Sequence, residues 1–293
     1  MKSKISTIIM IVVLLAGLSL LLYPSFADYW NSLHASYAVQ NYKEQLALLD
    51  AEAIDAAWNE AYAYNEQMKQ RGSYYELSAD LREQYETVLN IGGTGIIGYI
   101  DYPAIDATYP INHGTSEAIL TMAIGHLDWT FFPIDSGSSH AAISGHRGLP
   151  TAKLFTNLDR AEIGDLFTIE ILDTTFTYEV DQIEVVLPSD LTYLVTKNDP
   201  ADYLTLITCT PYGVNSHRML VRAHRVDDVS KLSRIRVTSE AALIEPIIIA
   251  PMLAIPMLLA LLIVIMVQDH RRKKHNEVKP ESDLWEETYD EYT

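Results

Sequence analysis

Two long apolar runs bracket the chain, and both are long enough to cross a membrane. The first run covers residues 5–23, directly after Lys2 and Lys4. At a helical rise of about 1.5 Å per residue, its length matches the hydrocarbon core of a bilayer, which is about 30 Å thick. The second run covers residues 241–267 and contains three prolines but no charge after position 245. Membrane helices tolerate proline better than soluble helices do, so the pattern predicts two membrane spans.

Basic residues beside the two runs predict their orientation. The first run follows two lysines, and the second precedes the basic cluster at 271–275. Because cytoplasmic flanks carry an excess of Lys and Arg, both termini are predicted to be cytoplasmic and the middle of the chain extracellular. The sequence thus predicts a cell-membrane protein with two transmembrane segments. A cleaved signal peptide is the alternative for the first run, but its apolar core normally has only about 7–15 residues.

The region after the first run has the periodicity of an amphipathic helix. Ile54, Trp58, Ala61 and Tyr62 recur at spacings of four, seven and eight residues, which places them on one helical face. No glycine or proline interrupts the stretch, so one helix is predicted over residues 34–70. A shorter helix or loop at 79–90 and a glycine-rich break at 91–95 complete this region.

From residue 96 onward the pattern changes to short β-rich runs separated by turn residues. Many short strands with turn punctuation indicate a barrel or a sandwich. The predicted strands lie at 98–101, 141–144, 166–169, 176–180, 183–186, 203–208 and 219–222.

These changes in pattern divide the chain into five predicted regions. They are a cytoplasmic stub with the first membrane anchor at 1–24, an extracellular helical or lid region at 25–95, a β-rich domain at 96–230, a second membrane helix at 241–267 and a cytoplasmic acidic tail at 268–293.

Charge and composition exclude some classes of function. The chain of 293 residues has a net charge of −18, and the predicted extracellular part holds 30 acidic residues against 14 Lys and Arg. A nucleic-acid-binding protein needs a basic face, so no nucleic-acid partner is expected. A hydrophobic content of 48% is enough for a packed core. The acidity permits weak calcium binding but defines no site, so no metal and no cofactor are predicted.

Cys209 is the single cysteine, and its place in the pattern makes it a candidate nucleophile. One cysteine can form neither an intramolecular disulfide nor a multi-cysteine zinc site. Cys209 comes directly after the strongest strand signal, at 203–208, where a thiol can be exposed. The alternative is a small buried hydrophobic side chain, because free cysteines are often buried.

Nucleophilic cysteine chemistry also needs an imidazole that moves protons and donors for an oxyanion. Of the seven histidines between the membrane runs, His146 lies at a strand exit, as Cys209 does. Arg218 begins the strand after the cysteine and can lie beside the thiol, and Arg222 shares its strand face. The alternative for each of these side chains is a solvated surface residue.

Three motifs resemble those of the sortase family. Residues 205–213 (TLITCTPYG), followed by Arg218, resemble the sortase active-site signature, and residues 144–150 (SGHRGLP) resemble its histidine motif. Residues 113–117 (HGTSE) are similar to those of class C, the pilus-assembling sortases, which also share the second membrane segment. The resemblance extends over about residues 96–226.

The resemblance implies a mainly β fold, an eight-stranded β-barrel with an N-terminal helical segment and two flanking transmembrane helices. It implies that Cys209 is the nucleophile, His146 the acid and base, and Arg218 the stabiliser of the oxyanion and substrate. The implied partners are pilin subunits with LPxTG-like sorting signals, cleaved between Thr and Gly, and an acceptor pilin lysine.

Three alternatives stay open beside a pilin polymerase. They are a sortase that anchors proteins to a cell-wall peptidoglycan precursor, an accessory or binding protein without catalysis, and a plain cysteine protease. Class C sortases commonly carry an Asp-Pro-aromatic motif in a lid over the cysteine. Residues 60–95 contain no such motif, and the nearest candidate is 72–76 (GSYYE), so the sequence predicts an open cleft.

Overall fold

The computed structural model of the chain describes residues 2–71, 75–194, 201–227 and 246–277. The chain forms two compact units. One combines residues 1–25 with residues 243–293, and the other comprises residues 26–242.

The first unit holds apolar helical segments from both ends of the chain. Helix α1 (Lys2–Leu46) contributes its N-terminal part, and helix α5 (Pro246–Glu277) contributes the other. Among the described residues, one helix is long and apolar enough to cross a membrane; it covers Ile8–Leu46 and has a mean hydropathy of 2.4 in its most apolar window. The described apolar stretch of α5, Ile255–Gln268, is shorter. The second membrane span therefore stays a prediction.

Helix α1 is continuous through the predicted boundary between residues 24 and 25, and the two compact units divide inside this helix, after Ser25. The N-terminal helices differ from the sequence prediction at one place. The single helix predicted over 34–70 is wrong, because α1 ends at Leu46 and helix α2 (Ala51–Gln70) begins after Asp50. The Asp50 carboxylate accepts a hydrogen bond from the backbone N–H of Ala53 at 2.9 Å, which caps the new helix. Helix α3 (Ala79–Thr87) follows, capped by Ser78.

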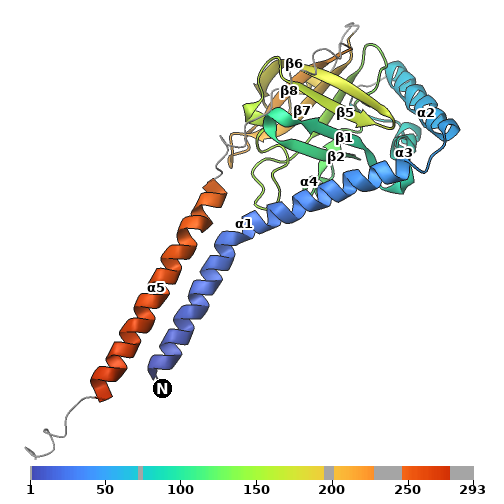
Figure 1. Cartoon of the computed structure of the whole chain (residues 1–293). Helices are drawn as coiled ribbons and strands as arrows, with labels where there is room; N and C mark the ends of the chain where they lie inside the picture. The colour runs from blue at the N-terminus through green and yellow to red at the C-terminus, as the bar shows by residue number, and fades with distance from the viewer. Residues whose placement is uncertain (1, 72–74, 195–200, 228–245, 278–293) are drawn as a thin grey trace, which may run out of the picture. The chain divides into compact units, whose positions relative to one another are not determined.

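The second unit is built on a closed eight-stranded barrel, as predicted (Figure 1). Its strand order is β1-β2-β3-β4-β7-β8-β6-β5. Two neighbouring pairs, β2 with β3 and β4 with β7, are parallel, and the other six pairs are antiparallel. The strands are β1 (Ile96–Tyr102), β2 (Ala107–His113), β3 (Ile124–His126), β4 (His140–Ser144), β5 (Leu166–Ile171), β6 (Thr174–Val186), β7 (Tyr203–Thr210) and β8 (His217–Val226).

The eight strands are not the seven predicted ones with one added. Strand β6 joins two predicted strands across a register shift between Val180 and Gln182. Strands β2 and β3 were not predicted, because β2 contains Pro110 and β3 has only three residues. A proline normally argues against a strand, but pairing of β2 with β3 begins only at Ile111, one residue after the proline.

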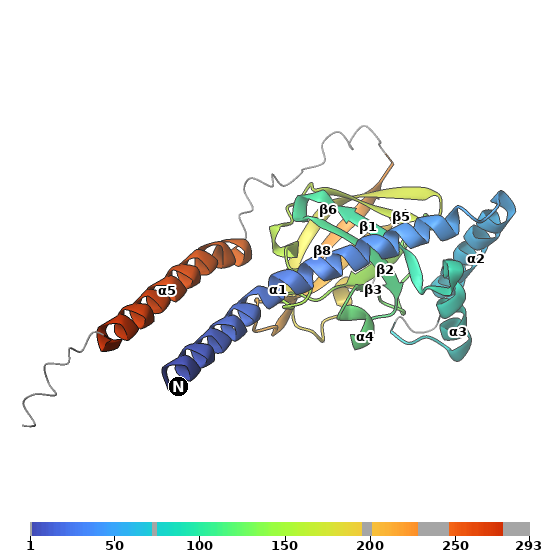
Figure 2. The same ribbon diagram turned by 60° about the horizontal axis from the view of Figure 1, so that its bottom comes forward.

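The part of α1 that belongs to this unit packs on the barrel wall. Figure 2 shows α1 passing across strands β1 and β2. The buried Tyr42 hydroxyl donates to the carbonyl of Ile97 at 3.2 Å and accepts from the N–H of Leu172 at 2.8 Å. Burial raises the pKa of Tyr42 to about 12, so the hydroxyl keeps the proton that it donates.

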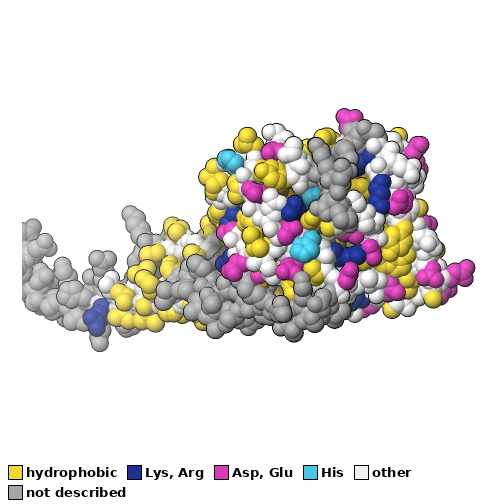
Figure 3. Space-filling view, turned by 90° about the horizontal axis from the view of Figure 1, so that it is seen from above, with side chains coloured by type: hydrophobic (Ala, Val, Ile, Leu, Met, Phe, Trp, Pro, Cys, Tyr) yellow, Lys and Arg dark blue, Asp and Glu magenta, His cyan; other side chains and the backbone are white. Residues whose placement is uncertain are grey.

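The surface of the barrel unit mixes charges of both signs. On the face in Figure 3, acidic and basic side chains alternate with apolar ones and form no continuous basic area. Several of the cations are paired with carboxylates, among them Arg222 with Asp181 and Arg225 with Asp135.

Candidate active site

Three neighbouring strands bring the predicted site residues into one row. Cys209 on β7 pairs directly with Arg218 on the antiparallel strand β8. On its other side, β7 is parallel to β4, with Ser144 opposite Ile207. The same register, continued by two residues, places His146 beside Cys209. Residues that pair across strands project from the same face of the sheet, so Cys209 and Arg218 share one side of the barrel wall. His146 follows two residues after the end of β4, on the other flank of β7.

Backbone contacts hold the ends of β4 and β7 together. The N–H of Gly145 donates to the carbonyl of Ile207 at 3.0 Å. The buried Thr208 hydroxyl donates to the carbonyl of Gly145 at 2.8 Å. These bonds extend the pairing past the end of β4, so His146 keeps its place beside the cysteine. Cys209 is a free cysteine and is partly exposed, so the alternative of a fully buried thiol is wrong.

His146 has a ring nitrogen that no hydrogen bond occupies. Its Nε2 atom is shielded from solvent and makes no hydrogen bond to any residue that the structure describes. The same atom lies 3.4 Å from Oε1 of Glu117, a contact that is ionic only when the imidazole is protonated. The ring can therefore hold or release a proton without breaking a hydrogen bond of the fold.

Two other histidines of the barrel unit are buried and kept neutral. Burial lowers the pKa of His126 to about 3 and that of His140 to about 4. The Nε2 atom of His126 is 2.7 Å from the carbonyl oxygen of Phe131, and that of His140 is 2.7 Å from the Thr205 hydroxyl. Both rings are tied into the core, so neither suits proton transfer near neutral pH.

Arg218 differs from its neighbour Arg222 in its partners. Arg222 forms a bidentate pair with Asp181, at 2.9 and 3.1 Å, and stacks over the ring of Tyr203. Nη1 of Arg218 donates to the carbonyls of Asn215 and His217, and within the described residues it pairs with no carboxylate. The charge of Arg218 is therefore available to an anion beside Cys209, whereas that of Arg222 is neutralised.

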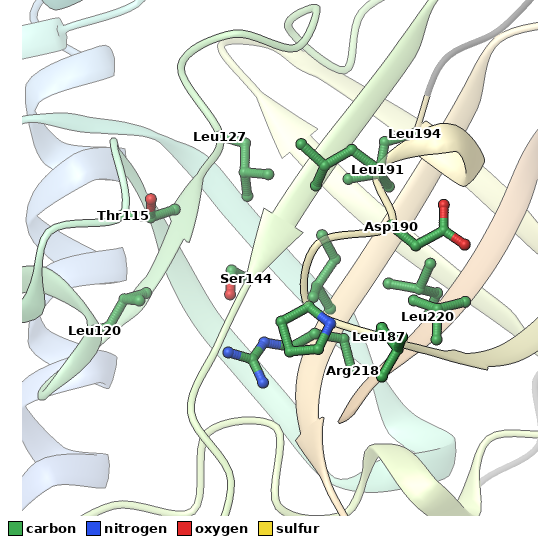
Figure 4. A pocket seen from close by; sticks show the side chains of 13 residues that line it. Thr115, Leu120, Leu127, Ser144, Leu187, Asp190, Leu191, Leu194, Arg218 and Leu220 are labelled. Atoms are coloured by element: carbon green, nitrogen blue, oxygen red, sulfur yellow. The ribbon is translucent and has the colours of Figure 1, made fainter. Parts of the chain in front are cut away.

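A groove runs beside Arg218 and has two walls (Figure 4). Leu187, Leu191 and Leu194, from the segment after β6, form one wall, and Thr115 and Leu120, from the connection between β2 and β3, form the other. Thr115 belongs to the motif at 113–117, and the other wall residues lie in connections without a helical or strand period, so the sequence pattern did not predict the groove. The remaining lining residues are Leu127, Ser144, Val186, Pro188, Asp190, Ile207, Arg218 and Leu220.

The first and last residues of the motif at 113–117 have different surroundings: His113 is buried, and Glu117 lies beside His146. His113 is buried, and its two ring nitrogens lie 3.1 and 2.8 Å from the carbonyl oxygens of Gly95 and Val88. These contacts tie the end of β2 to the segment that follows α3. The motif then reaches Glu117, the first residue of helix α4 (Glu117–Leu120), beside His146. From the sequence, this motif indicated only a similarity to class C sortases and gave Glu117 no role of its own.

The predicted open cleft is not tested by the structure. Of the nearest lid candidate, residues 72–74 lie outside the described residues. Tyr75 packs edge-on against the ring of Trp129, with 5.5 Å between ring centres.

Comparison with known proteins identifies one family. Residues 100–226 match the family model described as the sortase domain. The structure is similar to that of sortase C1 from Streptococcus agalactiae, with 44% sequence identity and a TM-score of 0.63; the match covers 66% of this chain and 99% of that one. It is also similar to a sortase C from Clostridium perfringens whose structure includes the C-terminal cell wall sorting motif, with 34% identity and a TM-score of 0.58, over 66% of this chain and all of that one.

A curated relative matches over a shorter stretch. Sortase D of Bacillus subtilis is 30% identical over 116 residues, which are 40% of this chain. The matched stretch spans about half of that relative, 55% of its length.

Proposed function

This chain belongs to the sortase family, and on that premise we propose that it is an extracellular cysteine transpeptidase anchored in the cell membrane. It cleaves LPxTG-like sorting signals between Thr and Gly and joins the acyl group to a pilin lysine, which polymerises pili. The observation that carries the proposal is the row of His146, Cys209 and Arg218 beside an apolar groove.

In the first half of the reaction, the Cys209 thiolate attacks the carbonyl carbon of the threonine. Arg218 lies directly opposite Cys209 and donates to the oxyanion that develops on the carbonyl oxygen. His146, as the imidazolium, gives its proton to the leaving amine of the glycine. The peptide bond breaks, and the threonine carbonyl stays on the sulfur as a thioester.

The groove supports a peptide substrate with apolar residues ahead of the scissile bond. Its leucine-rich wall, with Ile207 and Leu220 at the base, suits leucine and proline side chains, because transfer of apolar side chains out of water is favourable. Arg218 lines the same groove, so a peptide bound there has its carbonyl near the guanidinium. The relative from Clostridium perfringens was solved with a cell wall sorting motif, which favours the same class of substrate here.

In the second half, an amine resolves the thioester. We assign this role to a pilin lysine because the matched structures include sortase C1 from Streptococcus agalactiae and a sortase C from Streptococcus pneumoniae described by its pilin substrate specificity. The helix Ile8–Leu46 and the apolar stretch of α5 anchor the enzyme, with both termini in the cytoplasm. The catalytic domain is then extracellular, and pilins with sorting signals are expected on that extracellular side of the membrane.

We expect the full chain, purified in detergent, to form a thioester with an LPxTG-like peptide. It is then expected to transfer the acyl group to a lysine of a pilin. Intact-mass spectrometry measures the adduct on the protein, and a denaturing gel shows pilin ladders. Hydrolysed peptide as the sole product would identify a protease instead, and absence of any adduct would identify an accessory protein. Transfer to a peptidoglycan-like amine but not to pilin lysine would identify a cell-wall anchoring enzyme.

Arg218→Lys is expected to lower kcat/KM for thioester formation about 100-fold. Lysine keeps the charge but loses the planar fork of donors, and loss of a donor to an oxyanion typically costs about 10²–10³ in rate. Arg222→Lys is the matched control, because Arg222 is already paired with Asp181. Its kcat/KM is expected to stay within about threefold of the wild type. Equal losses in the two variants, measured with a fluorogenic peptide, would remove Arg218 from the mechanism.

A further inference from the structure

We propose that Glu117 binds the ammonium group of the incoming amine and holds it beside His146. The inference rests on the proposed function and adds to it a subsite for the second substrate. Its substrate class is a primary amine that is protonated in solution, such as a lysine side chain.

Glu117 lies in the segment that forms one groove wall, between Thr115 and Leu120, and is open to solvent. Its side chain is 81% exposed, and its Oε1 atom is 3.4 Å from Nε2 of His146. Thr115 and Leu120, on either side of it in the sequence, form the groove wall opposite the leucine-rich wall (Figure 4). An amine that approaches over Glu117 therefore enters from the side that the apolar part of the sorting signal does not occupy.

Among the described residues, one acidic side chain lines the groove, and its carboxylate already accepts two hydrogen bonds. Asp190 lies in the leucine-rich wall, and its Oδ1 atom accepts from the backbone N–H of Thr192 at 3.2 Å and from the Thr192 hydroxyl at 2.5 Å. The Glu117 carboxylate accepts no hydrogen bond from a described residue, and its contact is the one with Nε2 of His146. Arg218, the cation of the groove, would repel an ammonium, so the carboxylate of Glu117 is the favourable place for it.

The reaction itself frees Glu117 when the amine is needed. The contact between Glu117 and His146 is ionic only while the imidazole carries a proton. Formation of the thioester transfers that proton to the leaving glycine amine, so His146 becomes neutral and Glu117 loses its cationic partner. The carboxylate can then exchange its partner for the ammonium of the second substrate.

The group transfer balances with the residues named. The bound ammonium releases one proton to solvent and becomes an amine with a free electron pair. Its nitrogen attacks the thioester carbonyl, the carbon–sulfur bond breaks, and Cys209 leaves as a thiolate. The second proton of the nitrogen passes to His146, so an amide forms and the imidazolium–thiolate pair is restored.

The test compares a charged with an uncharged nucleophile. The full chain in detergent is supplied with a sorting-signal peptide, and thioester resolution is measured with a lysine-containing peptide and with hydroxylamine, which is neutral at pH 7. The ratio of the two kcat/KM values is expected to fall about threefold in Glu117→Gln and about tenfold in Glu117→Lys, as for an exposed ion pair that is lost or reversed. Glu60→Gln is the matched control, because Glu60 lies on α2, which contributes no residue to the groove.

A second measurement varies the ionic strength for the wild type and for Glu117→Gln. Raising the ionic strength from about 0.05 to 0.5 M shortens the screening length, so the same ratio is expected to fall in the wild type but not in Glu117→Gln. A ratio that is equal in Glu117→Gln and Glu60→Gln overturns the inference while leaving the enzyme intact. Absence of a thioester in the wild type overturns the proposed function instead.

Discussion

Cys209→Ala is expected to abolish thioester formation and pilin ladders, with a loss of at least about 10⁴-fold in peptide cleavage. The chain has no second cysteine, so no other thiol can replace the missing nucleophile. Residual catalysis from the oxyanion donor and the groove needs water as the nucleophile, and water is far weaker than a thiolate.

The measurement combines intact-mass spectrometry with a fluorogenic peptide assay. Cys209 is partly exposed at a strand end, so its truncation leaves the core intact and the circular dichroism spectrum should match the wild type. A folded Cys209→Ala protein that still cleaves the peptide and polymerises pilins would disprove the enzymatic role of this residue.

Tyr85→Ala is expected to lower the free energy of unfolding by about 4 kcal/mol, in the range for truncation of a fully buried aromatic side chain. Tyr85 on α3 is completely buried and stacks on Phe132 with ring centres 5.4 Å apart. Its hydroxyl lies 3.1 Å from Nδ1 of His126 and accepts from the N–H of Gly114 at 2.8 Å. One side chain therefore joins α3 to the strand ends that lead to the groove.

Tyr85→Phe separates packing from hydrogen bonding in the same cluster. It keeps the ring and removes the hydroxyl, so a smaller loss of about 2 kcal/mol is expected from the donors and acceptors left unpaired. Urea unfolding of the full chain in detergent, followed by intrinsic fluorescence, gives both values. Equal stabilities of wild type and Tyr85→Ala would show that α3 contributes nothing to the barrel.

The placement of the three site residues could be predicted because strand ends are a local property. His146 and Cys209 each follow a short apolar strand, and Arg218 begins the next one. That pattern, with the family motifs around it, was sufficient to nominate the row. The short runs alone left a barrel and a sandwich open, and the family resemblance implied the barrel. Strands β2 and β3 were missed because one contains a proline and the other is too short for a period to appear.

The role of the remaining histidines could not be predicted from their neighbours in the sequence. His126 is the last residue of β3 and His140 the first residue of β4, so both lie at strand ends, and both are buried. Whether such a ring is buried depends on what other elements place over it, and Tyr85, 41 residues away in the sequence, bonds to His126. The break between α1 and α2 was missed for a different reason: residues 47–50 contain no glycine or proline, and the cap at Asp50 is one polar residue within a helical pattern.

The sequence by itself determined the apolar run near the N-terminus, the β-rich second half, the single thiol and the three motifs around it. These are properties of composition and short-range period, which depend only on residues close in the chain. The tertiary structure alone decided that β4 and β7 run parallel in one register and that Glu117 meets His146. It also decided that Arg222 pairs with Asp181, whereas Arg218 pairs with no carboxylate among the described residues. Each of these depends on pairing between distant segments, whose register is set by closure of the barrel and by burial of its core.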